Sequence, residues 1–217
     1  MRQGFVKVAA VTPDIRVADV EYNTKQICAA LDEAAQERAK IVVFPELCVT
    51  GYTCGDLFAQ DVLLQAAKTA IKKIAAYTEE KDMLAFVGTP LQVDGKLYNT
   101  AAAVNRGKII GFTTKTFLPN YAEFYEMRQF APGPEACRDI LFDGESVPFG
   151  PQILFQARSM EQLIVAAEIC EDVWSPIPPS IGAALEGATV IVNCSASDET
   201  IGKDVYRREL IQGSLRV

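Results

Sequence analysis

Hydrophobic and polar residues follow one another along the chain in blocks whose period changes from strand-like to helix-like. Residues 5–11 and 41–44 are short apolar runs rich in β-branched side chains, each closely followed by proline, which predicts two buried strands. Between them, residues 20–39 repeat apolar side chains at helical spacing among charged ones. The same patterns predict a helix over residues 57–77 and a third strand over residues 83–88. Strand–helix–strand–helix–strand is the order of an α/β protein whose helices pack on a sheet.

The middle of the chain changes character after the third predicted strand. Residues 97–104 and 109–114 are separated by an Asn105-Arg106-Gly107 turn, which predicts consecutive antiparallel strands. Residues 119–136 then combine proline, aromatic residues and carboxylates with little periodicity. Because linkers rarely carry so many aromatic residues, we expect an ordered loop beside a site.

The last part of the chain returns to alternating strands and helices. Residues 163–169 predict another buried strand, and Pro176 to Pro179 open a helix that ends at Gly187. A strand over residues 188–193 and a helix from Lys203 to the end follow. The sequence stops inside this helix without a cap, so we expect residues 1–217 to be an incomplete domain at the front of a longer polypeptide.

Composition restricts the chemistry more than the fold. The chain has 217 residues, 49% of them hydrophobic and 23% charged, which is typical of an ordinary globular protein. It contains no histidine, which excludes a Ser-His-Asp triad, a Cys-His pair and a histidine-rich zinc site within this chain. Proton transfers in an enzyme of this composition must use carboxylates, lysine, tyrosine or cysteine.

Charge and cysteine spacing exclude further classes. The chain has 21 Lys+Arg against 28 Asp+Glu, a net charge of -7, which argues against a general nucleic-acid or anionic-membrane binder. No stretch approaches the ~18 apolar residues of a membrane span. The six cysteines form no C-x-x-C pair, so neither a zinc ribbon nor a thioredoxin-like motif is present. We therefore expect a reduced, cytoplasmic protein with no metal site.

Three predicted strands end directly in side chains that carry chemistry. Glu46 follows the strand at residues 41–44, Lys115 follows the strand at residues 109–114, and Cys170 ends the strand at residues 163–169. Ligand sites of open α/β folds collect outside such strand ends. Without histidine, a cysteine nucleophile needs another base, and desolvation brings a glutamate pKa toward the working range. A lysine and strand-end amides then stabilise the oxyanion.

Each of these residues, taken alone, also has a plain structural interpretation. A glutamate after Pro45 is often a solvated loop residue, a single lysine is usually a surface residue, and a buried cysteine is more often a small hydrophobe than a nucleophile. The three together favour catalysis. Cys48, Cys54 and Cys137 have no evident base partner, and we interpret them as structural or incidental. Cys28 lies on the apolar side of a predicted helix, and Cys194, which follows a strand, is a weaker candidate for lining a site than nearby Ser197.

The local motifs around these residues resemble the nitrilase superfamily, the carbon–nitrogen hydrolases with a Glu-Lys-Cys triad. Within it, they resemble the N-terminal glutaminase domain of glutamine-dependent NAD⁺ synthetases, and the resemblance covers essentially the whole chain. Four strings carry it: PELCVTGYTCGDLF (45–58), KTFLPNYAEFYEMRQFAPG (115–133), EICEDVWSPIPPS (168–180) and NCSASDETIGK (193–203).

The resemblance implies a role for individual residues. Cys170 is the expected nucleophile, Glu46 the general base and Lys115 the residue that stabilises the oxyanion. Glu123 is expected to hold the lysine and steer the leaving ammonia, with Glu126 as the alternative because the register of this loop is uncertain. The residues expected to line the glutamine pocket are Tyr52, Tyr121, Glu171, Trp174, Ser197 and Lys203. Glu171 suits the α-ammonium, and Lys203 with Ser197 suits the α-carboxylate, because a desolvated amino acid needs both charges paired.

The resemblance also implies a fold and a reaction. The expected fold is a four-layer α-β-β-α sandwich, cut before its C-terminal end. The expected reaction is glutamine hydrolysis, with ammonia passed to a separate synthetase domain that needs ATP and Mg²⁺ and is absent from residues 1–217; this domain itself needs no cofactor. The expected partners are L-glutamine, the synthetase domain and further copies in a homo-oligomer. Two alternatives remain: an amidase that acts alone on another carboxamide, and a non-catalytic module that keeps the fold.

Overall fold

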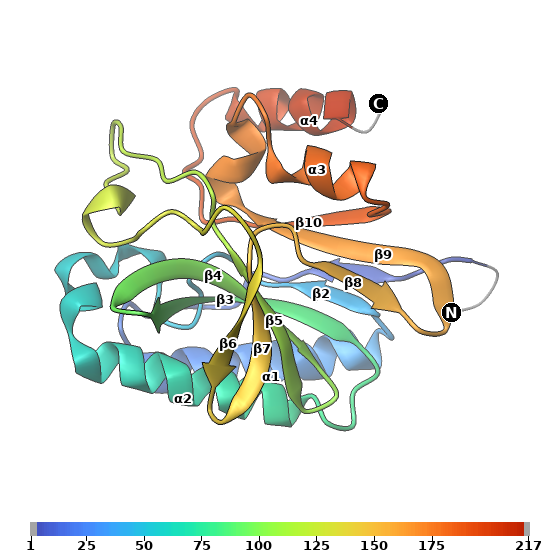
Figure 1. The fold of residues 1–217 in the computed structure, drawn as a ribbon, viewed down its shortest axis with the longest axis horizontal. Helices are drawn as coiled ribbons and strands as arrows, with labels where there is room; N and C mark the ends of the chain where they lie inside the picture. The colour runs from blue at the N-terminus through green and yellow to red at the C-terminus, as the bar shows by residue number, and fades with distance from the viewer. Residues whose placement is uncertain (1–3, 215–217) are drawn as a thin grey trace.

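Two β-sheets packed face to face form the centre of the molecule, and helices cover both outer faces (Figure 1). The computed structural model describes residues 4–214. Helices α1 and α2 lie against the outer face of the larger sheet, and α3 and α4 lie on the far side of the smaller one (Figure 1). These are the four layers of an α-β-β-α sandwich, so the expected fold is confirmed.

The larger sheet has seven strands in the order β1-β2-β3-β4-β5-β7-β6. Its first three strands run parallel, joined by α1 and then by α2, whereas β3, β4 and β5 run antiparallel. The hairpin predicted around Asn105-Arg106-Gly107 is therefore confirmed. The strands of the larger sheet are β1 (Val8–Ala10), β2 (Ile41–Val43), β3 (Leu84–Val93), β4 (Lys96–Asn105), β5 (Lys108–Thr114), β6 (Arg138–Phe142) and β7 (Glu145–Gly150).

The smaller sheet has three strands in the order β10-β9-β8. Strand β8 (Leu154–Ala157) pairs antiparallel with β9 (Met160–Ile169), and β9 pairs parallel with β10 (Val190–Cys194). Helix α3 (Pro179–Leu185) connects β9 to β10, and α4 (Lys203–Ser214) follows β10. The helix predicted to run from Lys203 to the end is present as far as it is described, and residues 215–217 lie outside the described part.

The predicted helix over residues 57–77 is two elements rather than one. The 3₁₀ segment η1 (Tyr52–Ala59) comes first, and α2 (Asp61–Tyr77) begins after Gln60. Gln60 has extended backbone angles, φ -92° and ψ 119°, so the helical ladder is interrupted there. By contrast α1 (Val20–Gln36) forms as one helix, with the Asp19 carboxylate accepting the Tyr22 N–H as its N-cap.

Two hydrophobic clusters hold the four layers together. One lies between the larger sheet and helices α1 and α2, with Ile27, Leu31 and Ile74 fully buried in it. The other lies between the two sheets, where the rings of Phe86 on β3 and Phe155 on β8 pack edge to face with centroids 5.4 Å apart. The second cluster fixes how the smaller sheet sits on the larger one.

The sequence pattern missed three strands and predicted two others, β3 and β9, too short. Strands β6 and β7 form a hairpin at one edge of the large sheet, and β8 is the edge of the small one. Leu141 of β6 is exposed although it is apolar, Pro148 lies within β7, and β8 has only four residues, so none of the three shows a clear alternation of polar and apolar residues. Strand β3 continues to Val93 because its residues from Ala85 onward pair with β4. No helix among residues 4–214 is long and apolar enough to cross a membrane.

Candidate active site

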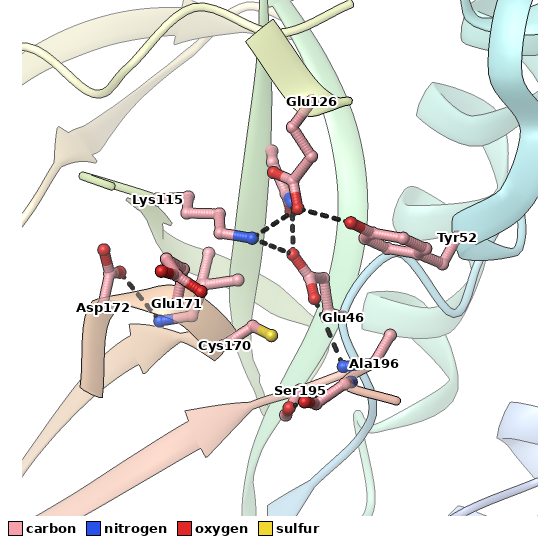
Figure 2. A network of polar contacts seen from close by, with 12 residues as sticks. Glu46, Tyr52, Lys115, Glu126, Cys170, Glu171, Asp172, Ser195 and Ala196 are labelled. Carbon is pink, nitrogen blue, oxygen red and sulfur yellow. Dashed lines mark hydrogen bonds and ion pairs between the residues drawn. The ribbon is translucent and has the colours of Figure 1, made fainter. Parts of the chain in front are cut away.

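Glu46 is buried at the carboxyl end of β2 and is held by three hydrogen bonds. Its side chain is fully buried. Oε1 accepts a bond from Lys115 Nζ at 2.7 Å and Oε2 accepts the backbone N–H of Ala196 at 3.2 Å (Figure 2). Oε1 also accepts a bond from Asn99 Nδ2 at 2.6 Å. All three partners are donors, so the side chain acts as an acceptor at both oxygens. A carboxylate held in this way faces the site with a fixed orientation.

Lys115 follows β5 directly and lies between two carboxylates. Its ammonium donates to Glu46 Oε1 at 2.7 Å and to Glu126 Oε1 at 2.6 Å, and its side chain is fully buried (Figure 2). Burial by itself lowers the pKa of this lysine, but the charges of Glu46 and Glu126 outweigh burial and raise the pKa above its ordinary value. Lys115 therefore stays cationic in the interior and is available to stabilise negative charge.

Glu126, rather than Glu123, is the second carboxylate that contacts the lysine. Glu126 belongs to the short 3₁₀ segment η2 (Glu126–Arg128) and is 4% exposed, whereas Glu123 is exposed on the loop surface. Burial and the nearby Glu46 charge raise the pKa of Glu126. Of the two glutamates that the sequence left open, Glu126 and not Glu123 contacts Lys115, because the loop turns so that residue 126 points inward.

Tyr52 supports this second carboxylate. Its hydroxyl donates to Glu126 Oε1 at 2.7 Å (Figure 2), and burial followed by the Glu126 charge raises the pKa of the phenol. The phenol therefore keeps its proton and its hydrogen bond. The structure places Tyr52 on the glutamate behind the lysine; its expected contact with a substrate stays a prediction.

Cys170 begins the 3₁₀ segment η3 (Cys170–Trp174), at the point where β9 ends. Its φ is +45°, a left-handed conformation that is uncommon for a residue with a side chain. This turn directs the thiol away from β9 and toward the space between Glu46 and Ser195 (Figure 2). The strand end therefore presents a sulfur to the buried cluster, as a nucleophile requires.

The surroundings of Cys170 disfavour a permanent thiolate. Burial, followed by the Glu46 charge, raises the pKa of the Cys170 thiol to about 12, although Lys115 and hydrogen bonding by Ser195 and the Ala196 backbone lower it. Glu46 and Lys115 are thus both near enough to act on the sulfur electrostatically. At neutral pH the group is a thiol, so any reaction through its thiolate needs a base to remove the proton.

The residues expected to line a substrate pocket fall into two groups. The Tyr121 hydroxyl donates to both carboxylate oxygens of Glu171 at 3.0 Å. Lys203 pairs with Asp198 and lies over the Trp174 ring, with Nζ 5.5 Å from the ring centroid. Ser197 is partly buried beside them on the loop after β10, where its N–H donates to Ser195 Oγ at 3.3 Å. The role of these residues in binding a substrate stays a prediction.

Several polar residues of the site were missed by sequence reasoning. Asn99 lies within β4 and orients Glu46, and Asp172 accepts the backbone N–H groups of Ile169, Thr116 and Phe117 at 2.8–3.0 Å. Asp172 thereby ties the turn at Cys170 to the segment that follows Lys115. The sequence did carry a signal for both residues: Asn99 is a polar residue within an apolar strand, and Asp172 is a polar residue shortly after one.

Comparisons with known proteins identify the family. A family model described as carbon-nitrogen hydrolase matches residues 7–210. The chain belongs to the carbon–nitrogen hydrolase family. Among curated relatives of this hydrolase chain, the glutamine-dependent NAD(+) synthetase of Mycobacterium leprae is 38% identical over 212 residues, which is 98% of this chain and 31% of that protein. The corresponding enzyme of Aquifex aeolicus is 34% identical over 90% of this chain and 31% of its own length. The hydrolase chain thus spans about a third of the length of these relatives.

Solved structures agree with this assignment. A glutamine-dependent NAD(+) synthetase from Cytophaga hutchinsonii superimposes with a TM-score of 0.85 at 31% identity, covering 96% of this hydrolase chain and 33% of that one. An amidase from Nesterenkonia sp. shares the fold with a TM-score of 0.72 at 19% identity, over 94% of this chain and 69% of its own. Among residues 4–214, the hydrolase has no cluster of three or more histidine, cysteine, aspartate or glutamate side chains placed to hold a metal ion.

Proposed function

We propose that this carbon–nitrogen hydrolase domain is a glutamine amidohydrolase with Cys170 as nucleophile, Glu46 as general base and Lys115 as oxyanion stabiliser. One observation carries the proposal: three strand ends from two sheets bring these residues, distant in sequence, into one buried cluster (Figure 2). A thiol, a carboxylate and an ammonium are the groups that acyl transfer needs when histidine is absent.

The proposed reaction proceeds through a thioester. Glu46 accepts the thiol proton while Cys170 Sγ attacks the side-chain carboxamide carbon of glutamine. The oxyanion forms against Lys115 Nζ and backbone N–H groups. Glu46 then returns the proton to the departing nitrogen, ammonia leaves, and a γ-glutamyl thioester remains. Glu46 next activates water, which attacks the thioester and releases glutamate and the thiol.

Glu126 has a supporting part in this proposal. Lys115 must remain charged and must not rotate toward solvent when Glu46 changes its protonation state. The second contact, to Glu126 Oε1 at 2.6 Å, holds the ammonium in place during that change. Tyr52 fixes Glu126 in turn. We therefore assign the lysine-holding part to Glu126, and we retain Glu123 as a residue that faces the leaving ammonia.

The free amino-acid end of glutamine is proposed to bind beyond Cys170. Glu171, oriented by Tyr121, offers negative charge to the α-ammonium, and Lys203 with Ser197 offers donors to the α-carboxylate. Because Lys203 is paired with Asp198, the substrate carboxylate has to share or displace that partner. Trp174, under the Lys203 ammonium, provides a wall for the aliphatic part of the substrate.

The relatives suggest where the ammonia goes. Because they are glutamine-dependent NAD(+) synthetases about three times as long as this chain, we propose that ammonia is passed to a synthetase domain that amidates deamido-NAD to NAD⁺. ATP and Mg²⁺ belong to that domain, and the glutaminase reaction uses neither. We also propose a homo-oligomeric, cytoplasmic enzyme.

A covalent trapping experiment tests the proposal. The protein that carries this chain is incubated with an electrophilic glutamine analogue, and the modified residue is located by mass spectrometry. We expect labelling at Cys170 and protection by glutamine. In the same protein, Cys170→Ala should abolish glutamine hydrolysis while ammonia-dependent NAD⁺ synthesis continues. Cys28→Ala, at a buried cysteine of α1, is the matched control and should retain both activities.

Other outcomes of this experiment point to other functions. Labelling at a different cysteine contradicts the assignment of the nucleophile. Faster cleavage of a neutral amide than of glutamine indicates an amidase that acts on another carboxamide. Loss of both activities in Cys170→Ala means that the residue is structural, as expected of a non-catalytic module.

A further inference from the structure

The backbone of Cys170 is held on both sides by one side chain, that of Asn193. The Cys170 N–H donates to Asn193 Oδ1 at 3.1 Å, and Asn193 Nδ2 donates to the Cys170 carbonyl at 3.4 Å. Asn193 lies near the end of β10, the strand that pairs with β9. Its carboxamide therefore bonds to Cys170 as a neighbouring peptide group would, at the residue whose φ is +45°.

A buried glutamate determines which way round that carboxamide lies. Glu168 is the register partner of Asn193 across β9 and β10, and Glu168 Oε1 accepts Asn193 Nδ2 at 3.3 Å. A carboxylate can only accept, so it selects the orientation in which Nδ2 points to Glu168 and Oδ1 points to the Cys170 N–H. The opposite orientation would set a donor against a donor at Cys170.

Glu168 is itself fixed and makes no ion pair with any residue that the structure describes. It is 3% exposed, and Oε2 accepts the Ser180 N–H at the start of α3 at 3.2 Å. Burying a carboxylate without a cation is costly, because the lost hydration is only partly replaced. A glutamine or an apolar residue would fill this position at a lower cost, so packing alone does not account for an acid here.

We infer that Glu168 and Asn193 form a positioning pair for the nucleophile. Glu168 orients Asn193, and Asn193 holds Cys170 in the left-handed turn that directs its thiol to Glu46. The pair also occupies the Cys170 N–H, so the oxyanion must be bound by Lys115 and by other backbone amides. This inference rests on the proposed function of Cys170 and adds the device that keeps the thiol in place.

A reciprocal exchange of the two side chains tests the pair. In Glu168→Gln, the new amide can turn its NH₂ group against the Asn193 donor; in Asn193→Asp, two carboxylates face each other. In the double variant, the introduced glutamine amide donates to the introduced aspartate, which still accepts the Cys170 N–H. Between residues 168 and 193, and at the Cys170 N–H, donors and acceptors then match again with the same net charge; only the 3.4 Å bond from residue 193 to the Cys170 carbonyl is lost. The matched control is Glu161→Gln, the same change at an exposed position of β9.

The measurements are kcat and KM for glutamine, and the rate at which iodoacetamide alkylates Cys170. We expect each single variant to lower kcat by about 100-fold with KM within about threefold, because a displaced nucleophile impairs the reaction and not binding. The double variant should recover at least about tenfold, since coupled residues deviate from additivity. The alkylation rate of Cys170 should likewise fall in each single variant and recover in the double variant. Glu161→Gln should match the unmodified protein in both kcat and alkylation rate.

The outcomes separate this inference from the proposed function. If the double variant is no better than the worse single variant in either assay, the positioning pair is wrong. If the unmodified protein does not hydrolyse glutamine but alkylation still shows loss and recovery, the glutaminase proposal fails and the pair stands. Should these variants not fold, Glu168→Asp keeps the charge but withdraws the carboxylate from Asn193 Nδ2 by one methylene, and a kcat loss of about fivefold is expected. An unchanged kcat in that variant overturns the inference.

Discussion

At the scale of single residues, the site is a buried group of charges whose members hold one another in place. Lys115 forms ion pairs with both Glu46 and Glu126. Asn99 donates a further hydrogen bond to Glu46, and Tyr52 donates one to Glu126. Removing one member of such a group leaves the others buried without compensation. The net charge around Cys170 therefore changes strongly when the charge of Glu46 is removed.

The pH dependence of Cys170 reactivity follows from this balance. Burial and the Glu46 charge hold the pKa of the thiol at about 12, so the thiolate fraction at neutral pH is small and rises with pH. Glu46→Gln removes a charge that opposes the thiolate and leaves Lys115, which favours it. We expect this variant to lose glutamine hydrolysis but to be alkylated by iodoacetamide roughly tenfold faster at a pH of about 8, since one pKa unit changes the thiolate fraction tenfold.

The alkylation rate is measured from a pH of about 6 to about 10, where most side-chain thiols titrate, and the Glu46→Gln curve should lie at lower pH. Glu161→Gln, the same change at an exposed carboxylate of β9, is the control and should leave the curve in place. A curve displaced to higher pH in Glu46→Gln would contradict the assignment of Glu46 as the group that acts on the thiol.

At the scale of elements, three strand ends place Glu46, Lys115 and Cys170, and neighbouring strands hold those ends still. The turn after β2 crosses directly over Gly88 of β3, where a Cβ atom would lie 2.3 Å from both the Pro45 carbonyl oxygen and the Leu47 nitrogen. These are backbone atoms on both sides of Glu46 and cannot move aside without displacing it. The absence of a side chain at residue 88 is thus a requirement of the site.

Gly88→Ala is expected to displace the turn that carries Glu46. Overpacking of this kind lowers the free energy of unfolding by about 1–3 kcal/mol, and a shift of about 1 Å in a reacting group lowers kcat by about 100-fold. Thermal unfolding and glutamine hydrolysis measure the two effects. Gly213→Ala, where a Cβ would meet no atom within 4 Å, is the control. An active Gly88→Ala protein would mean that the turn tolerates movement.

The elements also show what the sequence could and could not predict. Buried strands such as β2 and β9 have continuous apolar runs, so their ends, and with them the places of Glu46 and Cys170 in the fold, were predicted correctly. The loop before η2 has no period, and nothing local indicates that residue 126 rather than residue 123 points to Lys115. Asn193 and Glu168 meet only because β10 pairs with β9 in one register, which is a long-range property.

At the scale of the whole molecule, the site lies across the joint between the two sheets. Glu46 and Lys115 follow strands of the seven-stranded sheet, whereas Cys170 follows a strand of the three-stranded one. The distance between Cys170 and Glu46 therefore depends on how the sheets pack. Phe155 fills this joint: it contacts Phe86, and its ring occupies the space left by Gly111, where a Cβ would be 3.1 Å from it.

Two phenylalanine truncations distinguish the effect of packing between the sheets from the effect of a general loss of stability. Phe155→Ala and Phe142→Ala should each lower the free energy of unfolding by about 3–5 kcal/mol, because both remove a buried ring. Phe142 packs against Phe112 on the helix side of the large sheet, away from the joint. We therefore expect Phe155→Ala to lower kcat by about tenfold or more in the folded protein, while Phe142→Ala leaves it nearly unchanged. Calorimetry and kinetics at a temperature where both variants are folded measure the difference. Equal losses of kcat would show that activity follows stability alone, whereas the expected difference would show that sheet-on-sheet packing sets the distance between thiol and carboxylate.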